Sequence, residues 1–220
     1  MVVKFDRNLL TGAPDLSFEK ELWSAGILHI AGIDEAGRGA LAGPVAASAL
    51  ILPPDPGIKK VLQGVRDSKE MTPAEREEWA TRLPRLALAW GVGFATHMEI
   101  DRLGIVPATR LAAQRALGFL QISAQHLLID FLELPECCLP QTPIVKGDAR
   151  CLSIAAASIL AKTARDALLR QLDEEYPGYG FAAHKGYPTA AHRAAIARLG
   201  PSPIHRLSFK LTKVEGEVAL

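Results

Sequence analysis

Residues 27–52 have the sequence ILHIAGIDEAGRGALAGPVAASALIL. Two apolar segments, each long enough for a buried strand, flank a core that contains Asp34, Glu35 and the glycine-rich run at 37–43. Two adjacent carboxylates at the end of an apolar strand are costly to bury unless a cation holds them. The glycines let the backbone approach a ligand and expose N–H groups to it, and Arg38 adds a bidentate donor for phosphate. Together these features suggest metal ions that grip a phosphodiester.

Two other interpretations of this stretch remain open. A plain hairpin would use the glycines only for its turn and leave both carboxylates solvated, but it does not explain why two acids are adjacent. A dinucleotide-binding loop is the second alternative, because Gly37, Gly39 and Ala42 match the pattern G-x-G-x-x-G/A. Such a loop opens a helix that receives the pyrophosphate. Here Pro44 is followed by VAASALIL, which predicts another strand.

Composition and length are those of a globular protein. The 220 residues are 49% hydrophobic and 22% charged, which allows one compact domain with a sizeable core. The first ten residues, MVVKFDRNLL, lack the apolar region of a signal peptide, and no apolar run reaches membrane-spanning length. The three cysteines are an odd number without a C-x-x-C motif, which favours free thiols in a reducing compartment. We therefore expect a cytoplasmic protein that does not associate with a membrane.

Charge is distributed unevenly along the chain. Residues 146–213 contain 11 Lys and Arg against 5 Asp and Glu, a net charge of +6, although the whole chain has a net charge of +1. The remainder therefore has a net charge of −5. A basic C-terminal third beside an acidic N-terminal site fits a protein in which one part holds cations and the other holds phosphates. A basic solvated face explains the charge alone equally well.

Hydrophobic patterns and turn residues predict alternating strands and helices. The expected strands cover residues 27–33, 45–52, 86–95 and 126–130, with an extended segment at 141–145. The expected helices cover about 72–83, 107–121, 153–176 and 189–199, and a short helical piece precedes residue 22. Thr72, Pro73 and Glu75 form a capping box with proline at the first helical position. Residues 176–188, YPGYGFAAHKGYP, form a loop too long for a simple connector.

The third of these helices has an expected apolar stripe. Leu160, Ala164, Leu168 and Leu172 recur at a spacing of four, which places them on one face. Lys162, Arg165 and Asp166 lie off this stripe, and Ser153 is the expected N-cap of the helix.

Acidic residues follow several of the apolar runs. Strand ends line the ligand crevice of open α/β sheets, so Asp34 and Asp130 meet there if their strands are parallel neighbours, and Asp148 arrives from the next loop. Three such acids would form an oxygen-rich site for Mg²⁺ or Mn²⁺ instead of zinc. Glu35 can join them only if the chain leaves strand geometry, because successive strand residues point to opposite faces. Taken singly, Asp130 and Asp148 are more often turn acids than ligands.

Five segments together resemble ribonuclease HII, the type 2 ribonuclease H family. They are AGIDEAGRGALAGPV, DSKEMTPAERE, HLLID, VKGDARCLSIAAASILAKTARD and YGFAAHKGYPTAAH, and the resemblance covers about residues 27–209. It implies an α/β, ribonuclease-H-like fold, with a mixed central β-sheet flanked by helices and a helical C-terminal part. Within a single catalytic domain over residues 1–220, the core would cover about 27–172 and the substrate-binding part about 173–213.

The resemblance also implies an activity and its residues. The activity is endonucleolytic cleavage of RNA in RNA·DNA hybrids and at ribonucleotides within duplex DNA, leaving 3′-hydroxyl and 5′-phosphate ends, by a monomer with two Mg²⁺ or Mn²⁺ ions. The implied catalytic and metal-binding acids are Asp34, Glu35, Asp130 and Asp148. The implied residues that read the RNA–DNA junction are Gly37, Arg38, Gly39 and Tyr187, and the implied phosphate contacts are Lys69, Lys146, Lys162 and Arg165. The family usually has glycine where this chain has Phe131.

Two other classes of function compete with a nuclease. A nucleic-acid-binding module without catalysis would keep the basic third, Arg38 and Tyr187, but should lack one or more of the acids. A scaffold protein has no need for an acid cluster. Of the histidines, only His184, beside Lys185, is a candidate to approach the site.

Overall fold

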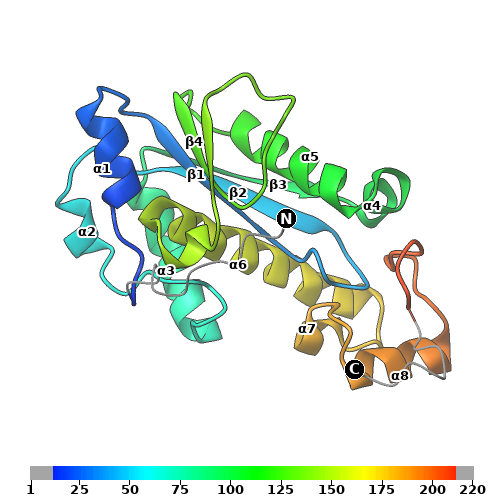
Figure 1. The fold of residues 1–220 in the computed structure, drawn as a ribbon. Helices are drawn as coiled ribbons and strands as arrows, with labels where there is room; N and C mark the ends of the chain where they lie inside the picture. The colour runs from blue at the N-terminus through cyan, green and yellow to red at the C-terminus, as the bar shows by residue number, and fades with distance from the viewer. Residues whose placement is uncertain (1–11, 212–220) are drawn as a thin grey trace.

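In the computed structural model, which describes residues 12–211, a five-stranded mixed sheet forms the centre (Figure 1). The spatial order is β3 (Ala89–Ala95), β2 (Val45–Ile51), β1 (Ile30–Ala36), β4 (His126–Asp130) and β5 (Gln141–Ile144). The pairs β1–β2 and β2–β3 are antiparallel, whereas β1–β4 and β4–β5 are parallel. This confirms the predicted α/β class and mixed sheet. The predictions for residues 1–11 and 212–220 lie outside the described residues.

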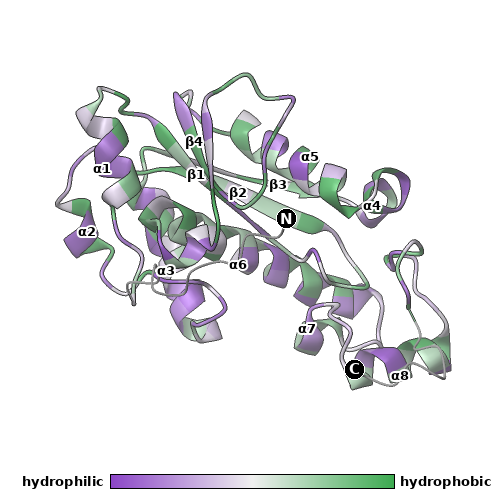
Figure 2. Cartoon of the chain, viewed as in Figure 1, coloured by the Kyte–Doolittle hydropathy of each residue, from purple (hydrophilic) through white to green (hydrophobic). Residues whose placement is uncertain are grey.

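Helices cover both faces of the sheet. On one face, α5 (Ile105–Gly118) packs its alanines on β2 and β3, and α4 (His97–Leu103) precedes it. On the other face lies α6 (Leu152–Glu175), which contacts β1 and β2 and is covered in turn by α3 (Pro73–Leu86). Helix α3 is mainly hydrophilic on its outer side (Figure 2).

Shorter elements complete the chain. Helices α1 (Ser17–Ser24) and α2 (Ile58–Val61) lie at one end of the sheet, and α7 (Phe181–His184) and α8 (Ala190–Leu199) lie at the other (Figure 1). The 3₁₀ helix η2 (Gly147–Ala149) joins β5 to α6. No helix among residues 12–211 is long and apolar enough to cross a membrane.

Several predicted boundaries are wrong, each for a local reason. Helix α3 continues two residues past Pro84, because the turn is still closed by the bond from Ala87 N–H to the Leu83 carbonyl. The prediction missed α4, although Thr96 and Glu99 form a capping box like that of α3. The helix expected at about 189–199 is present as α8, with Thr189 as its N-cap.

The predicted start and apolar stripe of α6 also need correction. Cys151, not Ser153, is its N-cap, and the Ser153 N–H donates to the carboxylate of buried Glu19 in α1. Beyond its wholly buried first half, the buried positions are Ala161, Arg165 and Leu169, together with Asp166. This face lies one position from the predicted stripe, so Arg165 points inward.

Glycine permits a very close approach between β1 and α6. A Cβ atom at Gly32 would lie 2.3 Å from the backbone carbon of Ser153. Because β1 and α6 pack backbone to backbone at this point, the strand that carries Asp34 and the helix that follows Asp148 are held at a short, fixed separation.

Candidate active site

Three acids converge where β1 and β4 end. Asp34 lies in β1, Asp130 is the last residue of its parallel neighbour β4, and Asp148 lies in η2 after β5. One carboxylate oxygen from each lies within 4.8 Å of the others. Within residues 12–211 this is the one group of three or more His, Cys, Asp or Glu with such spacing. The predicted convergence of these three acids is therefore present in the fold.

The environment of Asp34 and Asp130 opposes their negative charge. Burial, and then the charges of Glu35, Asp130 and Asp148, raise the pKa of Asp34 well above its usual value. Burial, and then the charge of Asp148, raise the pKa of Asp130 to about 6, although the Gly147 N–H donates to its carboxylate at 2.7 Å. Crowded carboxylates of this kind are normally held by cations, and an all-oxygen donor set fits Mg²⁺ or Mn²⁺.

Lys69 supplies one positive charge to this group. Its Nζ lies 3.0 Å from Oδ2 of Asp148. Partial burial works against the charged form of Lys69, but the Asp148 carboxylate outweighs it and raises the pKa of the lysine. The lysine therefore stays charged beside the acids.

Glu35 is not a member of the three-acid group. The ladder between β1 and β2 continues through Ala36, so Glu35 stays in strand geometry instead of leaving it beside Asp34. Its Oε1 accepts a bond from Arg38 at 3.2 Å. Burial raises the pKa of Glu35, and the charge of Arg38 opposes this shift.

The glycine-rich segment leaves the sheet without forming a helix. Gly37 has a positive φ of 94°, and the segment continues through Pro44 into β2. This excludes the dinucleotide-binding loop, which would open a helix. Within the described residues, the N–H groups of Gly37, Arg38 and Gly39 have no hydrogen-bond partner, which leaves three donors for a ligand.

One cavity of about 470 Å³ brings most of the predicted site residues together. Its lining includes Asp34, Glu35, Gly37, Arg38, Gly39, Lys69, Asp130, Lys162 and Tyr187. Asp148 and Lys146 line an adjoining cavity of about 360 Å³, which shares Lys69 and Asp130 with the first. Residues from distant parts of the chain, from Asp34 to Tyr187, therefore face one connected region.

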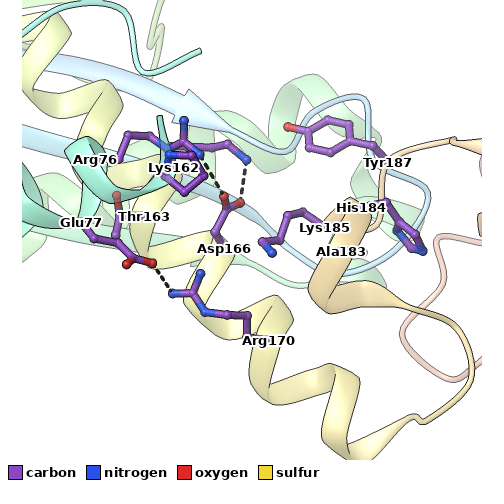
Figure 3. Close-up of a pocket in the computed structure, with 11 residues that line it drawn as sticks. Arg76, Glu77, Lys162, Thr163, Asp166, Arg170, Ala183, His184, Lys185 and Tyr187 are labelled. Atoms are coloured by element: carbon purple, nitrogen blue, oxygen red, sulfur yellow. Dashed lines mark hydrogen bonds and ion pairs between the residues drawn. The ribbon is translucent and has the colours of Figure 1, made fainter. Parts of the chain in front are cut away.

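A third, basic cavity of about 300 Å³ continues beyond Tyr187 (Figure 3). Asp166 lies between Lys162, whose Nζ is 2.6 Å away, and Arg76, whose Nη2 is 4.0 Å away. Lys185 enters from the α7 side, and Arg170 pairs with Glu77 at 3.2 Å. The sequence reasoning missed Arg76, although it belongs to the motif DSKEMTPAERE.

Arg165 does not support the predicted contact with phosphate. It is wholly buried, and its guanidinium donates to the carbonyls of Ala42, Pro44 and Lys185 at 2.8–3.1 Å. Sequence reasoning also missed Arg206, an equally buried arginine in the segment HRLSF.

Three histidines, His184, His192 and His205, form a structural cluster and no metal site. The rings of His184 and His192 stack at 4.2 Å between centroids, and His192 Nε2 lies 3.0 Å from His205 Nε2. His192 Nδ1 also bonds to the carbonyl of Tyr187 at 2.9 Å. Because His184 stacks on His192, it supports the turn that carries Tyr187.

Comparison with known proteins agrees with this geometry. The family model described as "Ribonuclease HII" matches residues 31–212. A relative from Moorella thermoacetica named "Ribonuclease HII" is 53% identical over 194 residues, covering 88% of this chain and 92% of the relative. One from Synechococcus with the same name is 52% identical, covering 89% and 88%. The crystal structure of ribonuclease H2 from Pyrococcus horikoshii superposes with a TM-score of 0.70 at 26% identity, covering 84% of this chain and 95% of that one.

Proposed function

Because the chain belongs to the ribonuclease HII family, and is thus a ribonuclease H, a hydrolase that acts on RNA in RNA·DNA hybrids, we propose that it also cuts at single ribonucleotides in duplex DNA. The products would carry 3′-hydroxyl and 5′-phosphate ends. We also propose that it acts in the cytoplasm as a monomeric single domain. The observation that supports this function best is that three clustered acids and three unpaired backbone N–H groups face two adjoining cavities, which share Asp130 and Lys69.

Asp34, Asp130 and Asp148 are the residues that would hold divalent cations, with Glu35 as a fourth acid. When bound, a pair of Mg²⁺ or Mn²⁺ ions supplies an activated water and stabilises the leaving oxygen of a phosphodiester. The protein contributes a fixed arrangement of oxygens, because β1, β4 and η2 are rigid elements. Lys69, paired with Asp148, limits the repulsion among the acids before any cation binds.

The junction between RNA and DNA would be read by two segments. The 2′-hydroxyl, both donor and acceptor, distinguishes RNA from DNA. The free amides at 37–39 can donate to its oxygen, because glycine lets the main chain approach closely. Tyr187, across the same cavity, would pack on the following sugar, where an added hydroxyl would be desolvated or would clash.

Positive residues around the acids would bind the flanking phosphates. Lys69 and Lys162 line the main cavity, and Lys146 lines the adjoining one. We propose these three as phosphate contacts, and we remove Arg165 from the set because its donors are used inside the protein.

The decisive experiment maps cleavage of four labelled duplexes with Mg²⁺ or Mn²⁺: an all-RNA·DNA hybrid, DNA with one ribonucleotide, DNA alone and RNA alone. We expect cleavage of the first two only, with 3′-hydroxyl and 5′-phosphate ends. Binding of all substrates without cleavage would favour the binding module, which the presence of all four acids argues against. Cleavage of the hybrid alone would refute the single-ribonucleotide activity.

A further inference from the structure

Two wholly buried arginines lie behind the glycine-rich segment, and no carboxylate of the described residues lies within ion-pair distance of either. Arg165 comes from α6 and Arg206 from the segment after α8, and both are 0% exposed. Within residues 12–211 neither forms an ion pair with a carboxylate. Burying a charge without a counter-charge is costly, and apolar side chains of similar size would fill such a space at lower cost. Packing alone therefore does not account for the two buried guanidinium groups.

Their donors bind consecutive carbonyls of the segment. Arg165 donates to Ala42 and Pro44, at 3.1 and 2.8 Å, and Arg206 donates to Gly43, which lies between them, at 2.9 Å. A second donor of Arg206 reaches the carbonyl of Arg38, also at 2.9 Å. Side-chain donors fixed in a planar fork thus set the orientation of four peptide groups.

One of these peptide groups joins Arg38 to Gly39. In a planar trans peptide the C=O and N–H point in opposite directions. Since the Arg38 carbonyl points to Arg206, the Gly39 N–H points away from it. That N–H has no partner among the described residues, and Gly39 lines the cavity that contains Asp34. Arg206 therefore fixes the direction of a donor that is open to the substrate.

Arg165 also ties the segment to the turn that carries Tyr187. Arg165 donates to the Lys185 carbonyl at 2.9 Å, and its Cζ lies 5.4 Å from the ring centre of Tyr187. The Leu41 N–H donates to the Gly186 carbonyl at 2.8 Å, so the two backbones are also bonded directly. No space for a side chain is left between Gly37 and Arg165, because a Cβ atom at Gly37 would lie 1.9 Å from Nε of Arg165.

We propose that Arg165 and Arg206 are positioning residues, which hold the peptide groups at 38–44 and the Tyr187 turn in one rigid arrangement and so determine discrimination at the RNA–DNA junction. This inference rests on the proposed cleavage at single ribonucleotides. In a long all-RNA hybrid many phosphodiesters can enter the site, so small errors of position are tolerated. A single ribonucleotide offers one position, where a misplacement of about 1 Å can cost about 100-fold.

The test uses Arg206→Lys, Arg206→Met, Arg165→Lys and Arg165→Met in the full chain. We would measure kcat and KM on DNA with one ribonucleotide and on the all-RNA hybrid. We expect the ratio of the two kcat/KM values to fall by about 10- to 100-fold in the Met variants, through kcat. The Lys variants should recover part of this loss, because lysine keeps the charge and can donate to at least one carbonyl. If a Met variant does not fold, the Lys variant alone carries the comparison.

The matched control is Leu62→Ala, a buried position in the hydrophobic cluster that α2 and α3 form with β2 and the first turns of α6. It should lower the melting temperature and leave the substrate ratio unchanged. Equal losses on both substrates in the arginine variants, in proportion to melting temperature as in Leu62→Ala, would overturn the proposal.

A second readout does not depend on the proposed function. Amide hydrogen exchange at Leu41 and Gly43, whose N–H groups donate to the carbonyls of Gly186 and Ile204, should accelerate in the arginine variants while the amides of β1 and β4 stay protected. If the unmodified protein cuts hybrids but not single ribonucleotides, the proposed function fails in that part, and the exchange measurement still tests the positioning role. Unchanged exchange at Leu41 and Gly43 would refute it.

Discussion

Three residues other than glycine adopt a left-handed backbone conformation in the described part of the chain, and each adjoins the site. They are Phe131 (φ 58°), Lys146 (φ 55°) and Lys185 (φ 53°). Such a conformation costs an L-residue about 1–2 kcal/mol. Phe131 is 66% exposed, so no burial offsets the strain. The strain is thus concentrated beside the acids and Tyr187, as is common at functional sites.

The acid cluster gives a prediction for Asp34→Asn and Asp148→Asn. Both variants should lose cleavage but keep hybrid binding, because phosphate affinity comes mainly from Lys and Arg. Without divalent ions, Asp34→Asn should raise the free energy of unfolding by about 1 kcal/mol, or about 2–4 °C in melting temperature, because a buried repulsive charge is removed. Asp148→Asn should gain less, since it also loses the ion pair with Lys69.

Thermal melts of the unmodified protein and both variants, in a chelator and in Mg²⁺, test the predicted changes in stability. The unmodified protein should be stabilised by Mg²⁺, and both variants should respond weakly. Near-normal Mg²⁺-dependent cleavage by both variants would contradict the assignment of the acids.

Tyr187 gives a second prediction at this scale. Tyr187→Ala should lower cleavage at a single ribonucleotide by about 10-fold or more relative to the all-RNA hybrid, because its ring faces the cavity that contains Asp34. Tyr187→Phe should be milder if ring packing is the main contact. Rates on both substrates, with a thermal melt of each variant, decide the question. If losses are equal on both substrates and follow a lower melting temperature, Tyr187 is a structural residue only.

At the scale of elements, the sequence was sufficient where the controlling signals are local. Alternating strands and helices, the capping box of α3 and the acids at strand ends could all be predicted, because these patterns lie within short windows. The buried face of α6 could not be predicted. Arg165 appears polar in the sequence, but its partners are carbonyls of a distant segment, so the periodicity of the apolar residues placed it on the wrong side. Arg206 was missed for the same reason.

Two glycine substitutions should have opposite effects on the free energy of unfolding, one at the contact between β1 and α6 and one away from it. Gly32→Ala should lower the free energy of unfolding by about 3 kcal/mol or more, because its Cβ would overlap the backbone of Ser153. Gly118→Ala, at the end of α5 with nothing within 4 Å, should be neutral or stabilise by up to about 1 kcal/mol. Urea melts of both variants test this, and a neutral Gly32→Ala would mean that β1 and α6 can separate at little cost.

The histidine cluster between α7 and α8 predicts acid sensitivity. Burial lowers the pKa of His192 to about 4. Between pH 6.5 and 4 the unfolded chain therefore binds a proton at this histidine that the folded protein does not, so the stability that His192 contributes should fall as pH falls, by up to about 3 kcal/mol. Protonation of Asp34 and Asp130, whose pKa values are raised, acts in the opposite direction, so denaturant melts from pH 7.5 to 4.5 should show the effect of His192 as a difference in slope between proteins. His192→Gln should remove this contribution, whereas His29→Gln, outside the cluster, should not. Equal slopes in all three proteins would contradict the role of His192.

At the scale of the whole molecule, the acidic side chains and the basic side chains around the neighbouring cavities lie in separate places. The acids lie at the end of the sheet, and the cations of the basic cavity come from α3, α6 and α7 (Figures 1 and 3). Chain-wide net charge is only +1, so attraction to nucleic acid must arise from this local asymmetry. Binding should therefore depend on a few cations near the cavity.

The salt dependence of hybrid binding tests whether a few cations near the cavity supply the attraction to nucleic acid. Lys162→Ala and Lys185→Ala should each reduce the slope of log affinity against log salt concentration for an RNA·DNA hybrid by about one unit. Lys59→Ala, on the exposed side of α2, is the control and should leave the slope unchanged. Equal slopes for all variants would assign the basic cavity to a solvated face.

The bond from Arg206 to the Arg38 carbonyl joins residues 168 positions apart. Synthesis delivers the chain from its N-terminus, and folding follows that order. The sheet and its acids can assemble while the last segment is still inside the ribosome, but the amides at 37–39 gain their fixed direction only after residue 206 emerges. We therefore expect the nascent protein to be inactive at RNA–DNA junctions until translation is nearly complete.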